Sequence, residues 1–421
     1  MRYLVDNETV DKTLKEIGLK PVIKDGSYAQ LYKALFSPNG WDYLYRGRGY
    51  IKNFDEVREK FMSKEMQDKT RHLPAKNVSI YDIPFSFMMS HHKAGTKRPK
   101  TYGPRDIRPI LNHYPNTPCI TNKANLLRTL VPTEFRDPVG LRKPLVSMDL
   151  RSYPDAFRTL VPMPKHLDFL PLTFNLSKDN DVKAFEEYLL TPEGKTKFWI
   201  YKPEYMYAGR GIQLVSPGPE TAGITSLKNG IIQEYLMNPR TVGSSSGGPR
   251  KIDYRVMAMM VGVNPTVFFI SPLTFIRTSS YPFVKSFSIP NPEYVHITNQ
   301  SFQKNSTDFG KYEEGNTLIG EIEPGFKTIV KHVFNASLKN GEIMKGYKPN
   351  RFRQFEIFGF DFLVLDDGSI KLLEVNDNAG MEWNNKEADQ LGKDMIEEAV
   401  LLSLSILEGG SVSGSRLWIR I

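Results

Sequence analysis

The 421-residue sequence has one cysteine, Cys119, and no apolar run close to the roughly 18 residues that a membrane-spanning helix needs. A single cysteine excludes an intramolecular disulfide and a cysteine-rich zinc site, and it is typical of a reducing compartment. The first ten residues, MRYLVDNETV, lack the apolar core of a secretion signal. We therefore expect a cytoplasmic protein with no membrane partner, in which Cys119 is structural.

The sequence also lacks internal repeats and long low-complexity tracts, and 40% of its residues are hydrophobic. A chain of this length and composition buries a sizeable core and is expected to form two or three domains. Its formal net charge is +9, which favours an acidic partner such as a nucleic acid, an anionic membrane or an acidic protein tail. No nucleic-acid-binding motif accompanies the charge, so we expect no nucleic-acid partner.

Strand-like apolar runs separated by glycine-containing loops dominate residues 198–276, and helical periodicity returns at 326–338 and 394–407. An earlier helix is expected over 122–131, with Thr121 as its N-cap. Because strands follow one another without alternating helices, the pattern predicts an α/β (α+β) protein with a substantial antiparallel sheet.

Residues 359–376, GFDFLVLDDGSIKLLEVN, are predicted to form two apolar strands joined at Asp367-Gly368. Asp-Gly between apolar runs is a strong hairpin signal, because a two-residue type I′ turn needs positive φ at both central residues. A turn at these two residues places Asp361 directly opposite Glu374, with Asn376 on the same face as Glu374. That face is also expected to hold Leu363, Leu365, Ile370 and Leu372.

Two carboxylates and an amide at one end of an apolar face suggest a metal site. Like charges directly opposite each other destabilise a hairpin, and buried unpaired carboxylates are costly, but a divalent cation removes both problems. Ligands that are all oxygen suit Mg²⁺, which commonly bridges to phosphates. The alternative is that the acids lie at a solvated sheet edge or pair with Lys or Arg.

A lysine and two glycines upstream of the hairpin suggest a phosphate site. Lys202 ends a predicted strand and precedes a loop that contains Gly209 and Gly211. Glycine lets backbone N–H groups approach anionic oxygens closely, and lysine supplies a positive charge. The alternative for this loop is a simple hairpin turn.

Two further predicted strands carry candidates for a nucleotide site. IIQEYL (231–236) is a candidate to line an adenine base, although any buried strand has a similar sequence. Lys251, Asp253 and Arg255 alternate along the next strand and therefore share one face, which is unusual for a core strand. An exposed strand face is the alternative for these three residues.

Seven motifs stand in order between residues 108 and 381: ILNHYPNTPCITNKANLLRTL (110–130), FLPLTFNL (169–176), WIYKP…GRGI (199–212), IIQEYLMNP (231–239), KIDYRV (251–256), HITNQSFQK (296–304) and FEIFGFDFLV…KLLEVN (355–376). In these motifs and their order the chain resembles the tubulin–tyrosine ligase family of ATP-grasp enzymes. The resemblance implies an ATP-grasp fold of three parts. These are a small N-terminal α/β domain with a basic connection (1–110), a central domain (111–232) and a C-terminal antiparallel-sheet domain with the metal site (233–421).

The resemblance also implies roles for single residues. For ATP it implies Lys123, Lys202, Gly209, Gly211, Gln233, Tyr235, Leu236, Lys251 and Asp253, and for Mg²⁺ it implies Asp361, Glu374 and Asn376. The expected catalytic residues are Arg255, Arg277, Asn299 and Lys304. The two arginines are expected to stabilise the transferring phosphoryl group or the tetrahedral intermediate, because a guanidinium offers a planar fork of donors.

The activity implied by the resemblance is ATP-dependent formation of a peptide bond at a carboxylate of an acidic protein tail. ATP phosphorylates that carboxylate, and the amine of a free amino acid then attacks the acyl phosphate. The expected acceptor is the C-terminal tail of α-tubulin, which fits the positive net charge and implies association with the cytoskeleton. The basic stretch 93–108 is a candidate to steer such a tail, and a solvated linker is its alternative.

Three stretches resemble the tyrosine-adding members of the family more than the polyglutamylating and polyglycylating ones: FIRTSSYPF (275–283), FGKYEEGNTL (309–318) and the final LWIRI. Tyrosine is therefore the expected amino acid. The first alternative is a glutamylase or glycylase that acts on tubulin or another acidic protein. The second is a non-catalytic tubulin-binding scaffold of the same fold, which the intact metal-ligand set disfavours. Three departures from the family pattern leave the amino-acid selectivity open: the stretch DNAG (377–380), which begins at Asp377, the residue Glu234, and the insert SSSGG (244–248) before Lys251.

Overall fold

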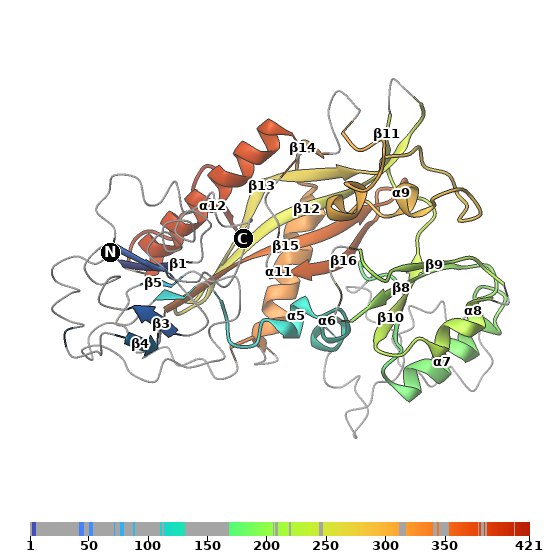
Figure 1. Ribbon diagram of the computed structural model, residues 1–421, viewed down its shortest axis with the longest axis horizontal. Helices are drawn as coiled ribbons and strands as arrows, with labels where there is room; N and C mark the ends of the chain where they lie inside the picture. Colours follow the sequence, from blue (N-terminus) through green and yellow to red (C-terminus); the bar gives the residue numbers. More distant parts are fainter. Residues whose placement is uncertain are drawn as a thin grey trace.

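The computed structural model (Figure 1) describes short stretches of the first 111 residues and larger parts of the chain after them. The described residues are 2–5, 42–45, 50–53, 71, 76–79, 87–88, 110–111, 113–130, 168–204, 206, 209–218, 220–243, 247–310, 317–339, 343–344, 353–377, 379, 383, 385–407 and 409–421. The basic stretch 93–108 lies outside them, as does most of the predicted N-terminal domain. No helix within these ranges is long and apolar enough to cross a membrane.

The largest sheet among the described residues has 11 strands, eight of them in the order β14-β13-β12-β15-β6-β5-β1-β2. These are β1 (Arg2–Val5), β2 (Asp42–Tyr45), β5 (Phe87–Met88), β6 (Ile110–Leu111), β12 (Arg250–Val261), β13 (Val267–Thr278), β14 (Thr317–Glu321) and β15 (Arg353–Val364). Beside them, β11 (Thr241–Val242), β16 (Ile370–Asn376) and β17 (Ile419–Arg420) pair with β12, β15 and β13. The strands from β12 to β17 pair antiparallel, whereas β15 continues through β6 into parallel pairs. A separate pair is formed by β3 (Tyr50–Asn53) and β4 (Lys76–Ser79).

Helices cover both faces of this sheet, as Figure 1 shows for α11 (Pro324–Lys339) and α12 (Lys386–Leu407). Alternate residues of β12 serve the two faces: Met257 and Met259 pack with α12, whereas Val256 and Ala258 pack with α11. The short α5 (Pro118–Thr121) and α6 (Lys123–Leu130) extend the α11 layer. Because both faces are covered, β12 is buried along its whole length, and its second half, residues 256–261, is apolar throughout.

A second sheet, of four strands, has the order β7-β10-β8-β9 and is antiparallel. Its elements are β7 (Thr173–Asn175), α7 (Asp179–Leu189), β8 (Phe198–Pro203), β9 (Gln213–Val215), α8 (Glu220–Gly223), the 3₁₀ helix η7 (Ile224–Ser226) and β10 (Gly230–Tyr235). An aromatic cluster of Phe174, Phe185, Tyr188 and Trp199 fastens α7 to the sheet. In Figure 1 this unit lies at one end of the large sheet, beside β16.

The hairpin of β15 and β16 differs from its prediction at the turn. Leu365 donates a 2.9 Å backbone hydrogen bond to Ser369, so the loop contains three residues, Asp366 to Gly368. Gly368 has a φ of +83°, whereas Asp367 is not among the described residues with positive φ. The predicted two-residue type I′ turn is therefore wrong.

A β-bulge compensates for the longer loop. Near the turn Phe362 pairs with Leu372, one residue away from the predicted register, but Asp361 still pairs with Glu374 because the ladder skips Leu373. The bulge also places Leu372 in the core with α11 rather than on the face of Glu374. The predicted acid pair is thus confirmed, and the predicted shared face with Ile370 and Leu372 is wrong.

Candidate active site

A pocket between the two sheets gathers most of the residues that the sequence singled out. The described residues on its wall include Lys123, Lys202, Gly209, Lys251, Asp253, Arg255, Arg277, Asn299, Asp361, Glu374 and Asn376. They come from α6, from β8 and the loop after it, from β12, β13, β15 and β16, and from the segment between α9 (Glu293–His296) and α10 (Gln300–Gln303). Residues more than 250 positions apart in the sequence therefore meet in one place.

Five of the predicted residues lie outside the pocket wall, namely Gly211, Gln233, Tyr235, Leu236 and Lys304. Gln233 supports a wall residue, because its Oε1 accepts a 2.7 Å hydrogen bond from Lys202 Nζ. Tyr235 does the same for Lys251, whose Nζ lies 2.9 Å from the tyrosine hydroxyl. Leu236 is half-buried at the end of β10, and Lys304 is exposed at the end of α10. Direct contacts of these five with a nucleotide or substrate stay predictions.

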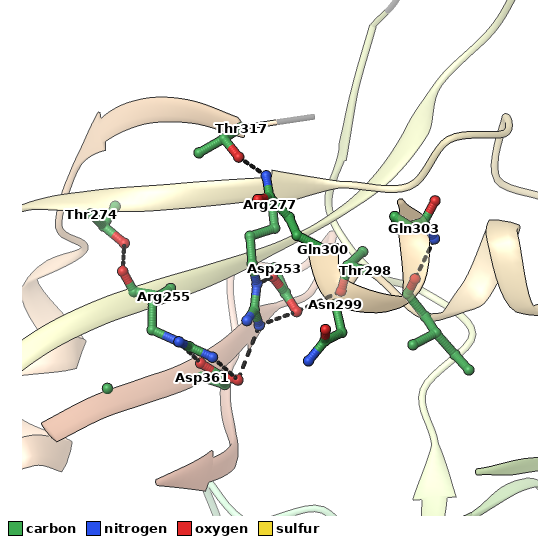
Figure 2. A network of polar contacts seen from close by, with 12 residues as sticks. Asp253, Arg255, Thr274, Arg277, Thr298, Asn299, Gln300, Gln303, Thr317 and Asp361 are labelled. Carbon is green, nitrogen blue, oxygen red and sulfur yellow. Dashed lines mark hydrogen bonds and ion pairs between the residues drawn. The ribbon is translucent and has the colours of Figure 1, made fainter. Parts of the chain in front are cut away.

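Two arginines and two aspartates form a buried network on the pocket floor (Figure 2). Arg277 donates 2.6 Å hydrogen bonds from Nε and Nη2 to Asp253, and its Nη2 also lies 3.1 Å from Asp361 Oδ2. Arg255 binds Asp361 through Nε and through Nη2, which is 3.0 Å from Oδ2. Thr298 donates a 2.5 Å hydrogen bond to Asp253. The guanidiniums are therefore held in fixed positions on a rigid sheet.

The network follows from the strand register. Asp253 is the cross-strand partner of Arg277, and Arg255 is the cross-strand partner of Asp361. Burial disfavours the charged carboxylate of Asp361, but the two guanidiniums outweigh it and hold its pKa well below its usual range. The two aspartates likewise outweigh the burial of Arg277 and raise its pKa. The predicted catalytic arginines are thus ion-paired, and their action on a phosphoryl group stays a prediction.

The three predicted metal ligands converge at the open end of the hairpin. Asn376 Nδ2 lies 3.5 Å from Asp361 Oδ2 and 3.4 Å from Glu374 Oε1. Lys123 Nζ approaches Glu374 Oε2 to 3.5 Å. Among the described residues no group of three or more His, Cys, Asp or Glu is placed to hold a metal, and the predicted set contains only two acids. Once its amide is rotated, Asn376 offers with the two acids the kind of oxygen donors that Mg²⁺ takes in proteins. Both acids also have basic partners, as the alternative to a metal site expected: Asp361 is paired with Arg255 and Arg277, and Glu374 with Lys123. Their role as metal ligands stays a prediction.

Two buried lysines give the pocket its unusual electrostatics. Burial lowers the pKa of Lys202 to about 8, although Glu374 partly offsets the effect. Burial lowers the pKa of Lys251 to about 7, with Asp253 as the main opposing group. Both ammonium groups are therefore poorly solvated, and an anion in the pocket stabilises their charged forms.

Asn122 precedes the pocket residue Lys123, and the sequence reasoning missed its structural role. Its Oδ1 accepts 3.0 Å hydrogen bonds from the backbone N–H groups of Ala124 and Asn125, so Asn122 caps α6 and the predicted N-cap, Thr121, is wrong. Its Nδ2 donates a 3.0 Å hydrogen bond to Glu204, directly after β8. Asn122 thus joins α6 to the small sheet. The preference for asparagine just before a helical run was the available signal.

Thr298 and His296 were missed as well, although both line the pocket. A threonine and a histidine inside a loop motif carry no separate signal in a single sequence. Glu234, one of the departures from the family pattern, forms an ion pair with Lys197 beside β8 and does not line the pocket.

A model of the tubulin-tyrosine ligase family matches residues 106–409 of the chain. The match covers well over half of the sequence, and the chain belongs to this family. The mixed α/β structure with its antiparallel sheets fits the ATP-grasp-like fold of the family, so the predicted fold class is confirmed. The domain boundaries stay predictions.

Several named relatives align with part of the chain. The mouse protein named "Probable tubulin polyglutamylase TTLL2" is 25% identical over 259 residues, which are 56% of this chain and 44% of the relative. "Probable alpha-tubulin polyglutamylase Ttll1" of Tetrahymena thermophila is 22% identical over 256 residues, or 55% of this chain and 59% of the relative. "Tubulin glycylase 3C" of the same organism is 26% identical over 232 residues, or 49% and 20%. The chain thus spans less than two thirds of each.

These relatives are named for adding glutamate or glycine. The expected tyrosine specificity is therefore not supported by the comparisons. The glutamylase or glycylase alternative agrees with them better.

Proposed function

We propose that the protein is an ATP-dependent ligase that joins a free amino acid to a carboxylate of an acidic tubulin tail. The charge of the pocket carries the proposal. Among the described residues that line it, six are Lys or Arg and three are Asp or Glu. This surplus of positive charge suits a polyphosphate, and Asp361 and Glu374 in the same pocket offer oxygen donors to a cation bound with it.

Each group of side chains has a part in that reaction. Lys202 and Lys251 bind the phosphates of ATP, while Asp361, Glu374 and Asn376 hold Mg²⁺, which neutralises developing phosphate charge when it is bound. The γ-phosphoryl group passes to the tail carboxylate, leaving ADP. The amine of the amino acid then attacks the acyl carbon, forms the peptide bond and releases phosphate and a proton. Arg255 and Arg277 stabilise the negative charge of the tetrahedral intermediate from fixed positions.

Glutamate or glycine is the proposed amino acid, because the aligned relatives carry these activities in their names. Tyrosine remains the second candidate, since the stretches 275–283 and 309–318 resemble the tyrosine-adding members of the family. We place the reaction in the cytoplasm, on tubulin and most directly on its α-subunit.

The test is a panel of incorporation assays. Purified protein is incubated with ATP, Mg²⁺, tubulin and one labelled amino acid at a time: glutamate, glycine or tyrosine, with detyrosinated tubulin included for the last. We expect ATP-dependent incorporation of glutamate or glycine, located by mass spectrometry on the tubulin tail. Incorporation of tyrosine alone would reinstate the tyrosine ligase. No incorporation together with intact tubulin binding would favour the scaffold.

A further inference from the structure

His296 belongs to a motif whose histidine has no role in the proposed reaction, yet it is buried against the pocket. Its ring packs edge-on against three aromatic rings, those of Tyr235, Phe283 and Phe287, with centroids 4.8–5.5 Å apart. This apolar surrounding lowers the pKa of His296 to about 4, with a partial offset from the Ser286 carbonyl. The imidazole is therefore neutral at ordinary pH and has one donor and one acceptor nitrogen.

The hydrogen-bond partners of the imidazole ring determine which of its nitrogens carries the hydrogen. Nε2 lies 3.0 Å from the carbonyl oxygen of Ser286, which only accepts, so Nε2 carries the hydrogen. Nδ1 must then be the acceptor, and the hydroxyl of Tyr235, 2.8 Å away, donates to it. Burial raises the pKa of Tyr235, so the hydroxyl keeps its proton. The tautomer thus follows from a single backbone carbonyl.

The same series of hydrogen bonds holds the ammonium group of Lys251 in position. Because the Tyr235 hydrogen is used on His296, the lone pairs of its oxygen face Lys251, whose Nζ donates a 2.9 Å hydrogen bond to it. Lys251 Nζ also donates a 2.8 Å hydrogen bond to the backbone carbonyl of His296. Two of its three N–H bonds are thereby committed, and Lys251 itself lines the pocket.

We propose that His296 is a positioning residue, which acts through the Tyr235 hydroxyl to hold the Lys251 ammonium group charged and aimed at the phosphates of the nucleotide. The role for the nucleotide rests on the proposed function, whereas the effect on Lys251 does not. The other charged groups that face Lys251 are Asp253, Lys202 and Arg277. These three charged groups are unchanged in every variant described below.

Two substitutions of His296 distinguish the roles of its two ring nitrogens. His296→Asn places an amide oxygen near Nδ1 and keeps the acceptor for Tyr235, whereas His296→Gln places its amide near Nε2 and removes that acceptor. In His296→Gln the tyrosine hydroxyl is then free to turn toward the carbonyl of residue 296, 3.4 Å away, which Lys251 uses. Tyr235→Phe removes the oxygen altogether and changes nothing else in the side chain.

The first measurement needs no nucleotide. The pH dependence of amine labelling at Lys251, followed by peptide mass spectrometry, gives its apparent pKa in each variant. Loss of a hydrogen bond to the charged form lowers a pKa, so we expect a fall of about one unit in Tyr235→Phe and His296→Gln, and about none in His296→Asn. The double variant Tyr235→Phe/His296→Gln is expected to have the same Lys251 pKa as Tyr235→Phe alone, because both changes break the same series of hydrogen bonds from His296 through Tyr235 to Lys251.

The second measurement is ATP binding by calorimetry, with thermal unfolding to confirm that each variant is folded. We expect ATP binding about tenfold weaker in Tyr235→Phe and His296→Gln, and close to wild type in His296→Asn. An unchanged titration of Lys251 in His296→Gln, or additive effects in the double variant, would overturn the role of His296. A wild-type protein that binds no ATP but shows the expected Lys251 titrations would overturn the proposed function and leave the positioning of the lysine standing.

Discussion

Gly359 on β15 lies directly beneath the side chain of Arg255 on β12. A Cβ atom at residue 359 would be 2.9 Å from Arg255 Cδ and 2.5 Å from the Cβ of Ala379. Only glycine leaves room for the arginine stem to cross the strand and reach Asp361. The absence of a side chain at one position therefore sets the geometry of the ion-pair network.

Gly359→Ala is expected to displace Arg255 and to abolish amino-acid incorporation. Overpacking at this buried site is expected to cost about 1–3 kcal/mol of unfolding free energy. Urea unfolding and the incorporation assay measure the two effects. The matched control is Gly368→Ala in the same hairpin, where the added Cβ meets open space. At its φ of +83° an alanine is expected to cost about 1 kcal/mol without loss of activity. Full activity in Gly359→Ala would contradict this account of Arg255.

Removal of the divalent cation is expected to stop ATP turnover, because the triphosphate charge is then only partly neutralised. Glu374→Gln is expected to lower turnover about 100-fold at fixed Mg²⁺ and to require more Mg²⁺ for half-maximal rate. Asp366→Asn is the control, since it removes one charge from the exposed tip of the same hairpin. Equal Mg²⁺ dependence in the two variants would argue against Glu374 as a ligand. Coupled ADP release measures both.

ATP binding is expected to take up protons at alkaline pH. Burial lowers the pKa of Lys251 to about 7 and that of Lys202 to about 8 in the free protein. Bound phosphates favour the charged forms and raise both values, so between the free and the bound pKa each lysine gains a proton on binding. ATP affinity is therefore expected to fall as the pH rises from about 7 to 9. Calorimetry in two buffers of different ionisation enthalpy counts the protons, and zero uptake at pH 8.5 would contradict a change in the protonation of these lysines on ATP binding.

Substitution of Asn122 is expected to separate helix capping from the contact between α6 and the small sheet. Asn122→Ser keeps an N-cap acceptor but loses the amide donor to Glu204, so it is expected to raise the KM for ATP several-fold with little loss of stability. Asn122→Ala loses both and is expected to cost about 1 kcal/mol in addition. Thermal unfolding and initial rates measure the two effects. A normal KM in both variants would show that the Glu204 contact does not position the pocket.

Much of the site was accessible from the sequence because its chemistry is carried by motifs with fixed strand alternation. Lys251, Asp253 and Arg255 occupy one face of a strand, and the structure brings all three to the pocket. The pairing of Asp361 with Glu374 was predicted as well. The local period of two brings the three β12 side chains together, whereas the acid pair forms through a three-residue loop and a bulge at Leu373 that the sequence did not predict.

The rest depends on contacts between distant segments, which local patterns do not encode. Nothing in the sequence indicates that Arg277 lies between two aspartates, since that follows from the register of three strands. The capping role of Asn122 required a choice between neighbouring residues that both favour N-caps. The neutral tautomer of His296 depends on the carbonyl of Ser286 and on the aromatic rings around it.

In the hairpin of β15 and β16, the three-residue loop and the bulge compensate for each other, so that Asp361 still pairs with Glu374. Two ladders of equal length are geometrically possible between Asp361 and Glu374: one with a two-residue turn and no bulge, and the observed one with a three-residue loop and a bulge at Leu373. Both ladders pair Asp361 with Glu374, so this pair at the open end of the hairpin does not depend on which turn forms. The apolar core favours the bulged ladder, because that ladder packs Ile370 and Leu372 against the core, whereas a ladder without the bulge turns Lys371 toward it. Substitutions at the hairpin tip are therefore expected to change the stability of the protein without changing the positions of Asp361, Glu374 and Asn376.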